Sequence, residues 1–427
     1  MGAAAPVLRI YPALGNTSFM LLWLGMMPAT LAVMMNQVAG PYAAFTLSNS
    51  AAVLGVVSLA QGVPMLLLSL LGGVVADRLP RRLVLMGSQT TLAIGAAFVA
   101  VFALADALQV WHIIAASFLQ GAAFAFNMPA RQAYIAELVP RAQLANAAAL
   151  NNAGQNFCRV AGPALGGVLL GIRGVGIGGA FAVMAVMYIA ALLVLFRLPG
   201  ARPPMGARAG AGGLAQVLEG LRYARSSGAI VALIFMNLVV VMFGMSYQTL
   251  MPVVAERVFG VGANGLGLLL AASGAGALAG AVAVTGLSRF PRPATLQFGL
   301  AIGLGLALIA FALVRAFPLA VALLAVVGFL FSAFSALNNT LLMANTDPRL
   351  TGRVMSIYLL TWGAMPLGAL PLAWLADRAG VPVAIALAGA IVAAVVLGIA
   401  VLHPTAHRIG WIAATPLVAG SSPDRRP

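Results

Sequence analysis

Long apolar runs separated by short polar segments repeat along the whole chain. Each run has close to the roughly 20 apolar residues that a helix needs to cross a bilayer. The pattern predicts twelve such helices, at 19–45, 51–76, 83–105, 111–126, 145–171, 178–198, 230–254, 265–287, 294–314, 319–339, 354–375 and 381–402. Transmembrane β-strands would instead alternate apolar and polar residues over about ten positions. The runs do not alternate, so we expect an all-α integral membrane protein.

The longest gap between runs divides the helices into two groups of six. We therefore expect a tail at 1–18, a first half at 19–198, a linker at 199–228, a second half at 229–403 and a second tail at 404–427. Within the linker, Leu214, Val217, Leu218 and Leu221 have helical spacing. This spacing predicts either a helix lying on the membrane surface or a solvated tether.

The two halves show traces of a common origin. Pro140-Arg141 precedes the fifth helix as Pro348-Arg349 precedes the eleventh, and Pro163 falls on Pro371 under the same offset. Two coincident prolines indicate a duplication, which fits a transporter built from parallel six-helix repeats related about the membrane normal.

Composition excludes a soluble domain. Hydrophobic residues make up 62% of the chain and charged residues 7%, and the mean hydropathy is +1.04. The net charge of +15 does not indicate nucleic-acid binding, because the basic residues lie in the gaps between runs. Most of them fall on the side that holds both termini. The positive-inside rule therefore predicts a multi-pass protein of the inner (cytoplasmic) membrane with both termini in the cytoplasm.

The densest charged segment is the block from Gly73 to Arg82, between the second and third runs. A central charge in hydrocarbon costs several kcal/mol, so the block is expected to be a hairpin at the membrane surface. Its gating residues would be Gly73, Asp77, Arg78, Arg81 and Arg82. Asp77 could face a helix N-terminus or an Arg and so act as a latch between access states. The alternative is a simple topology signal.

The run at 145–171 contains the largest number of polar residues. Asn152, Gln155, Asn156 and Arg159 share one helical face, and Asn151 broadens it. Such a face is costly against lipid, so it must meet protein or a water-filled cavity. An intramembrane charge is by default a candidate functional site, and we favour the cavity over hydrogen bonding between helices.

The charged block matches the pattern G-x-x-x-D-R-x-x-R-R, so the chain resembles the major facilitator superfamily. That resemblance implies two pseudo-symmetric six-helix halves and a transport function. The fifth run continues with Gly162, Pro163, Gly166 and Gly167, which resembles the antiporter signature of exporters in this superfamily. Pro163 would kink the helix, and the alternative is an ordinary helix with small residues that pack closely.

The segments Asn127–Gln132, Glu137–Pro140 and Leu144–Asn146 are similar to one branch of the superfamily, the transmembrane secretion effectors, which include enterobactin-exporter-like proteins. Arg131 and Glu137 could form an ion pair in the cytoplasmic loop between the fourth and fifth helices. Proton-coupled relatives carry an Arg where this chain has Ser117, and no Asp or Glu lies deep in a run. Protons are therefore the coupling ion that the resemblance implies, but the sequence argues against them.

Further polar residues within the runs are candidates for a central cavity: Asn36, Gln37, Gln61, Gln120, Asn237, Gln248, Asn338, Asn339 and Trp362. For each residue alone, hydrogen bonding between helices is the simpler role. Together they suggest a pocket for a neutral or anionic substrate with aromatic or apolar parts.

The sequence thus predicts a secondary active exporter of a small amphiphilic molecule, siderophore-like or drug-like. An importer or facilitator of the same fold is the first alternative, and a membrane assembly factor or sensor is the second. Nucleotide-binding and hydrolase motifs are absent, so no enzyme activity, cofactor or metal is expected. The single cysteine, Cys158, allows no internal disulfide. The expected partners are the substrate and membrane lipid, and the expected state is a monomer.

Overall fold

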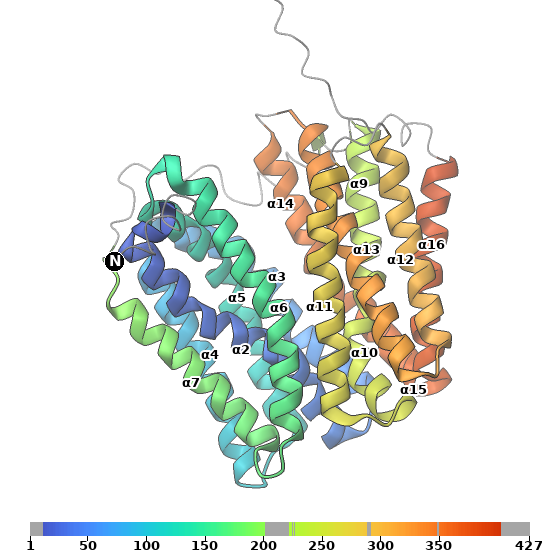
Figure 1. Ribbon diagram of the computed structural model, residues 1–427, viewed down its shortest axis with the longest axis horizontal. Coiled ribbons are helices and arrows are strands. Elements are labelled where there is room, and N and C mark those ends of the chain that lie inside the picture. Colours follow the sequence, from blue (N-terminus) through green and yellow to red (C-terminus); the bar gives the residue numbers. More distant parts are fainter. Residues whose placement is uncertain are drawn as a thin grey trace, which may run out of the picture.

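A computed structural model describes residues 12–200, 222–223, 225, 227–287, 292–347 and 350–402, with the side chains of 70–74, 76–78 and 285–287 left out. The described residues form helices joined by short turns (Figure 1). The predicted tails at 1–18 and 404–427 lie largely or wholly outside this part of the chain, as do Leu214, Val217, Leu218 and Leu221 of the predicted linker helix.

The first half contains six long helices: α2 (Thr17–Ser48), α3 (Ala51–Arg78), α4 (Arg81–Leu104), α5 (Val110–Leu138), α6 (Leu144–Gly171) and α7 (Gly176–Phe196). The 3-10 turns η1 (Pro12–Gly15) and η2 (Arg141–Gln143) precede α2 and α6. The boundaries have local causes. Asn16 caps α2 by accepting a hydrogen bond from the Phe19 amide at 3.1 Å. At the other end Asn49 adopts a left-handed conformation, with φ of 49°, and stops the helix.

The second half has the same plan with interruptions. Its first span consists of α9 (Gly228–Val239), the π-helix η3 (Val240–Gly244), α10 (Tyr247–Val253) and the π-helix η4 (Val254–Val258). The elements that follow are α11 (Gly262–Leu287), α12 (Pro293–Leu313), α13 (Phe317–Ala344), α14 (Thr351–Trp362), α15 (Met365–Ala379) and α16 (Val381–Leu402). Gly380, with φ of 91°, turns the chain between α15 and α16.

The connections define two ends of the molecule. We call the end with the α2–α3, α6–α7, η4–α11 and α15–α16 turns the Asn49 end, which is lower in Figure 1. The opposite end, with the α3–α4, α5–α6 and α13–α14 turns, is the Arg81 end. The halves lie side by side in Figure 1, α2–α7 on the left and α9–α16 on the right.

Two seams join the halves: α6 packs on α11, and α3 packs on α15. The α6–α11 seam depends on glycine. A Cβ on Gly167 would lie 2.7 Å from the Gly267 Cα, and a Cβ on Gly267 would lie 2.8 Å from the Pro163 carbonyl oxygen. Only residues without side chains allow the two backbones to approach this closely.

The structure departs from the sequence-based helix pattern in three places. The fourth span does not end near residue 126 but continues through Pro129 to Leu138. The eleventh span is not continuous, because α14 ends at Trp362 and α15 begins at Met365 with Pro366 in its first turn. The seventh span contains two π-helical segments. The sequence-based prediction ended the fourth span too early because Asn127 is polar. Hydropathy also does not indicate a local change from α-helix to π-helix.

Eleven of the described helical segments are long and apolar enough to cross a membrane. The segment outside this group is α6, which has membrane length but carries the polar residues of the predicted site. A twelfth spanning helix is therefore consistent with the fold, and its weak hydropathy follows directly from Asn152, Gln155, Asn156 and Arg159.

Candidate functional site between the two halves

The polar face of α6, defined as Asn152, Gln155, Asn156 and Arg159, lies between two packed edges of the helix. On one edge, Gly162 and Gly166 pack against Met34 and Met35 of α2, and a Cβ on Gly166 would lie 2.9 Å from the Met35 carbonyl oxygen.

On the other edge, Gly167 meets α11. Phe157 and Val168, on the far side of α6, are 66% and 52% exposed, as expected for residues facing lipid. At 100° per residue, the polar face therefore points toward the space between α2 and α11 and away from the lipid side.

Arg159 lies where the seam between α6 and α11 begins. A Cβ on Gly274 of α11 would lie 2.7 Å from the Arg159 carbonyl oxygen, so the second half reaches the α6 backbone at this level. The side chains of Arg159 and Asn152 are nevertheless exposed, and those of Gln155 and Asn156 are partly exposed. The polar face thus remains accessible from the seam toward the Arg81 end.

Asn151 belongs to a different environment. It is 8% exposed, and its Oδ1 accepts a hydrogen bond from Arg131 of α5 at 2.9 Å. Arg131 also donates to the Thr30 hydroxyl of α2 at 2.9 Å. The predicted pair between Arg131 and Glu137 is wrong, because both residues lie in α5 rather than in a loop, and Arg131 points into the first half to join α2, α5 and α6.

Glu137 instead forms an ion pair with Arg81 at the start of α4. The next residue, Arg82, donates to the carbonyl oxygen of Phe196 at the end of α7, at 2.9 Å. The described side chains of the predicted gating block therefore bond within the first half. Gly73, Asp77 and Arg78 lie in the last turns of α3, and the side chains of Asp77 and Arg78 lie outside the described residues.

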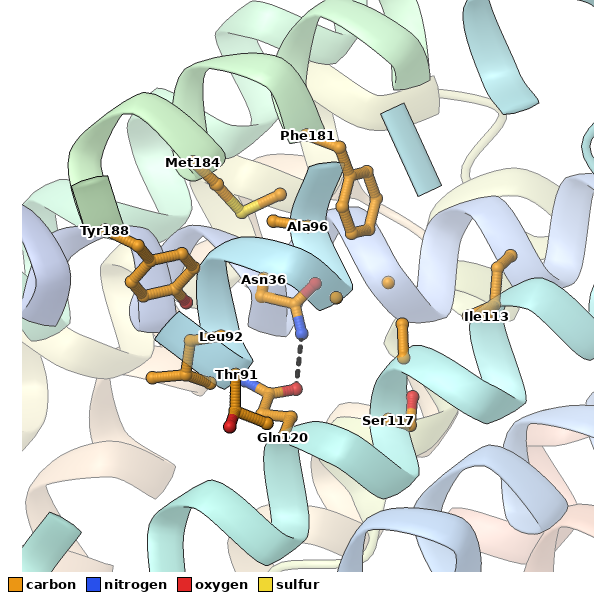
Figure 2. A pocket seen from close by; sticks show the side chains of 13 residues that line it. Asn36, Thr91, Leu92, Ala96, Ile113, Ser117, Gln120, Phe181, Met184 and Tyr188 are labelled. Carbon is orange, nitrogen blue, oxygen red and sulfur yellow. Dashed lines mark hydrogen bonds between the residues drawn. The ribbon is translucent and has the colours of Figure 1, made fainter. Parts of the chain in front are cut away.

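Two predicted cavity residues meet inside the first half. Figure 2 shows Asn36 of α2 donating to Gln120 Oε1 of α5 at 2.7 Å, beside a cavity of about 30 Å³. Ser117 and Tyr188 also line this cavity, which has room for a water molecule. The Asn36 Oδ1 atom is buried without a partner.

The remaining predicted residues are dispersed. Asn237 donates to Thr361 at 2.5 Å, and Asn338 accepts from Gln297 at 3.0 Å; both asparagines are fully buried within the second half. Trp362 is partly buried, and its ring makes an edge contact with Phe331 at 5.9 Å. Gln37 is exposed, while Gln61, Gln248 and Asn339 are partly exposed. Pro163 lies inside α6, which continues as one helix to Gly171.

The sequence-based reasoning missed a polar cluster that joins the halves at the Asn49 end. Asp377 of α15 accepts hydrogen bonds from the Ser50 hydroxyl at 2.6 Å and from the backbone amides of Ala51 and Ala52, each at 2.8 Å. Arg257 of η4 lies 3.7 Å from the same carboxylate.

The cluster extends along the end of α2. Arg257 donates to Asn49 Oδ1 at 3.1 Å and lies 5.1 Å above the Phe45 ring. Tyr42 donates to Glu256 at 3.0 Å. The concentration of charges at a span end was the available signal, but sequence alone cannot pair residues hundreds of positions apart. In the described part of the chain, no group of His, Cys, Asp and Glu is placed to hold a metal.

The sequences of relatives with a known function align with most of this chain. The multidrug efflux pump Tap of Mycolicibacterium fortuitum is 29% identical over 353 residues, which span 80% of this chain and 85% of Tap. The enterobactin exporter EntS of Citrobacter koseri is 29% identical over 289 residues, or 68% of each chain.

Solved transporters share the fold. A bacterial homologue of the human lysosomal transporter Spinster, in an inward-facing and unoccupied conformation, superposes with a TM-score of 0.69 over 92% of this chain and 96% of its own, at 17% identity. A D-xylose–proton symporter gives 0.68 over 90% and 97%, at 15% identity. The family model described as transmembrane secretion effector matches residues 10–415. The chain therefore belongs to the transmembrane secretion effectors, a family of secondary transporters within the major facilitator superfamily.

Proposed function

We propose that this protein exports a small amphiphilic molecule by alternating access, and that the polar face of α6 binds the molecule in transit. The supporting observation is that Arg159 and Asn152 are exposed next to a seam between the halves. Hydrogen bonds between the halves close the Asn49 end beyond that seam. A polar face accessible from one end only is what a half-cycle of alternating access requires.

The charge of this face favours neutral or anionic substrates. It carries one guanidinium and three amides, and α6 has no carboxylate anywhere along its length. A guanidinium binds carboxylate, phosphate or phenolate oxygens by charge-assisted hydrogen bonds. Export of a siderophore-like or drug-like compound also fits the multidrug pump and the enterobactin exporter among the relatives.

Orientation follows from the distribution of arginine. Arg81, Arg82 and Arg141 lie at the Arg81 end, so the positive-inside rule places that end in the cytoplasm of a bacterial inner membrane. The Asn49 end then faces outward, and the conformation described here is open toward the cytoplasm. Both termini and the linker would also be cytoplasmic.

Coupling to protons would need a carboxylate that changes its exposure. Arg159 cannot serve, since a guanidinium stays protonated. Glu256 and Asp377 both bond across the halves at the Asn49 end, so we propose them as the groups to test for pH-dependent transport.

The proposal can be tested with two aromatic dyes of opposite charge. Cells that express the protein, and cells that do not, are loaded with anionic calcein through its ester or with cationic ethidium, and dye retention is measured. We expect lower calcein retention with the protein. Arg159→Gln should slow calcein efflux about tenfold, since it removes a charge-assisted contact.

Arg315→Gln is the matched control, because Arg315 is an exposed arginine in the turn between α12 and α13. It should leave efflux unchanged. Efflux of ethidium alone, unaffected by Arg159→Gln, would contradict the assigned substrate class. Accumulation of calcein would indicate an importer, and an absence of flux for both dyes would favour a role without transport.

A further inference from the structure

The first turn of α3 is capped by a residue from the other half of the protein. The first amides of any helix lack partners within it and need an acceptor. In α3 the side chain of the N-cap residue, Ser50, makes no capping hydrogen bond. The amides of Ala51 and Ala52 donate instead to Asp377, which is 326 and 325 residues further along the chain.

The same carboxylate also meets two other donors. It accepts from the Ser50 hydroxyl at 2.6 Å and faces Arg257 at 3.7 Å. Since a helix N-terminus carries a partial positive charge, an anion placed there is stabilised. The Asp377 side chain is 26% exposed, so solvent screens these interactions in part.

Two other first-half helices are capped from their own sequence. Asn16 caps α2, and Gln109 and His112 form a reciprocal capping box at α5. Those caps do not depend on how the two halves are arranged, because each lies within one half. The cap of α3 exists only while α15 lies against it, so it links the stability of one helix end to the closure of the Asn49 end.

We propose that Asp377 is a detachable N-cap that holds the Asn49 end closed. Opening this end separates α15 from α3, which exposes the Ala51 and Ala52 amides and leaves the carboxylate without its helix. The cost of that loss biases the resting protein toward the state closed at the Asn49 end. The inference rests on the proposed alternating access, but it concerns the balance between the two states and not the substrate.

The test measures opening directly, without transport. Ala373 of α15 is fully buried one turn before Asp377, with its Cβ 3.2 Å from where a Cβ on Gly55 of α3 would lie. The reporter is Ala373→Cys in a Cys158→Ala background. Its alkylation by a membrane-impermeant maleimide is followed in right-side-out vesicles. Asp377→Ala should raise the rate about fivefold, the factor expected for loss of a helix cap.

Three comparisons isolate the cap. Asp106→Ala removes an exposed carboxylate at the same end of the molecule and should leave the rate unchanged. Asp377→Asn keeps an acceptor but loses the charge, so its effect should be smaller than that of Asp377→Ala; this nearly isosteric variant carries the test if the alanine variant is not inserted. Arg257→Gln keeps the cap and should also give a smaller rise.

The proposal is overturned if Asp377→Ala and Asp106→Ala give the same rate of alkylation at the Ala373→Cys reporter. It is also overturned if Arg257→Gln reproduces the full effect while Asp377→Asn has none, because the ion pair would then be the element that holds the end closed. Efflux is measured separately in intact cells. A chain that exports neither dye but still shows the Asp377 effect on labelling would refute the export function and leave the cap intact.

Discussion

Arg131 is a partly buried arginine whose described hydrogen-bond partners are neutral. It donates to Thr30 and Asn151, while its Nε atom is buried without a partner. Buried charges are normally paired, because an uncompensated charge in a low-dielectric interior is costly. The side chain therefore joins three helices at an energetic cost. A carboxylate in place of the neighbouring Asn151 amide would supply the missing negative charge.

We predict that Asn151→Asp raises the apparent melting temperature of the purified protein in detergent. The new carboxylate has the shape of the amide it replaces and converts a neutral acceptor at 2.9 Å into a charged one. Asn151→Ala should lower stability by about 1–3 kcal/mol, since it leaves a donor of Arg131 unpaired. Asn152→Asp, on the exposed neighbouring position, is the control and should change little. Equal effects at 151 and 152 would argue against this interpretation.

At the residue scale, the sequence allowed some assignments and not others. Helical spacing alone placed Asn152, Gln155, Asn156 and Arg159 on one face of α6, and the structure has them there. Spacing could not show that Asn151 turns inward to Arg131. It also could not pair Glu137 with Arg81 or Ser50 with Asp377, because such partners are brought together by packing between helices that are distant in the chain.

At the element scale, packing of α11 against α13 depends on reciprocal glycines. A Cβ on Gly276 would overlap the Ala325 carbonyl oxygen, and a Cβ on Gly328 would overlap that of Ser273. Membrane helices gain little from hydrophobic burial and associate through such close backbone contacts. The two helices therefore pack closely at positions where any added side chain would force them apart.

Gly276→Leu should lower the thermal stability of the protein in detergent and the amount inserted in membranes, because the leucine side chain cannot fit without moving α13. Gly299→Leu is the matched control in α12, where an added Cβ meets nothing within 4 Å. Size-exclusion chromatography with a thermal ramp measures both variants. If the two glycines tolerate leucine equally, backbone contact does not determine this packing.

Helix positions were predictable from hydropathy because each span must present apolar side chains to lipid or to its neighbours. The breaks were not. The interruption between α14 and α15 and the π-helices η3 and η4 occur within apolar sequence. Local backbone geometry there is set by contacts across the bundle, which hydropathy does not report.

At the scale of the whole molecule, the arrangement predicts different accessibility at its two ends. In a Cys158→Ala background, Asn152→Cys should react with a membrane-impermeant maleimide in inside-out vesicles and react at least about tenfold more slowly in right-side-out ones. The reason is that the Asn49 end is closed beyond it. Asp106→Cys, exposed near that end, should show the reverse pattern. Labelling of Asn152→Cys equally from both sides would contradict a closed Asn49 end.

The glycine contact between α6 and α11 has a consequence for motion. Gly167 and Gly267 meet backbone to backbone, so no side chain separates the two helices at this point. A change in crossing angle about this point requires no rotamer change at either glycine, because neither has a side chain. Substitution of either glycine by a larger residue would add a side chain there and would favour whichever single angle the new side chain fits.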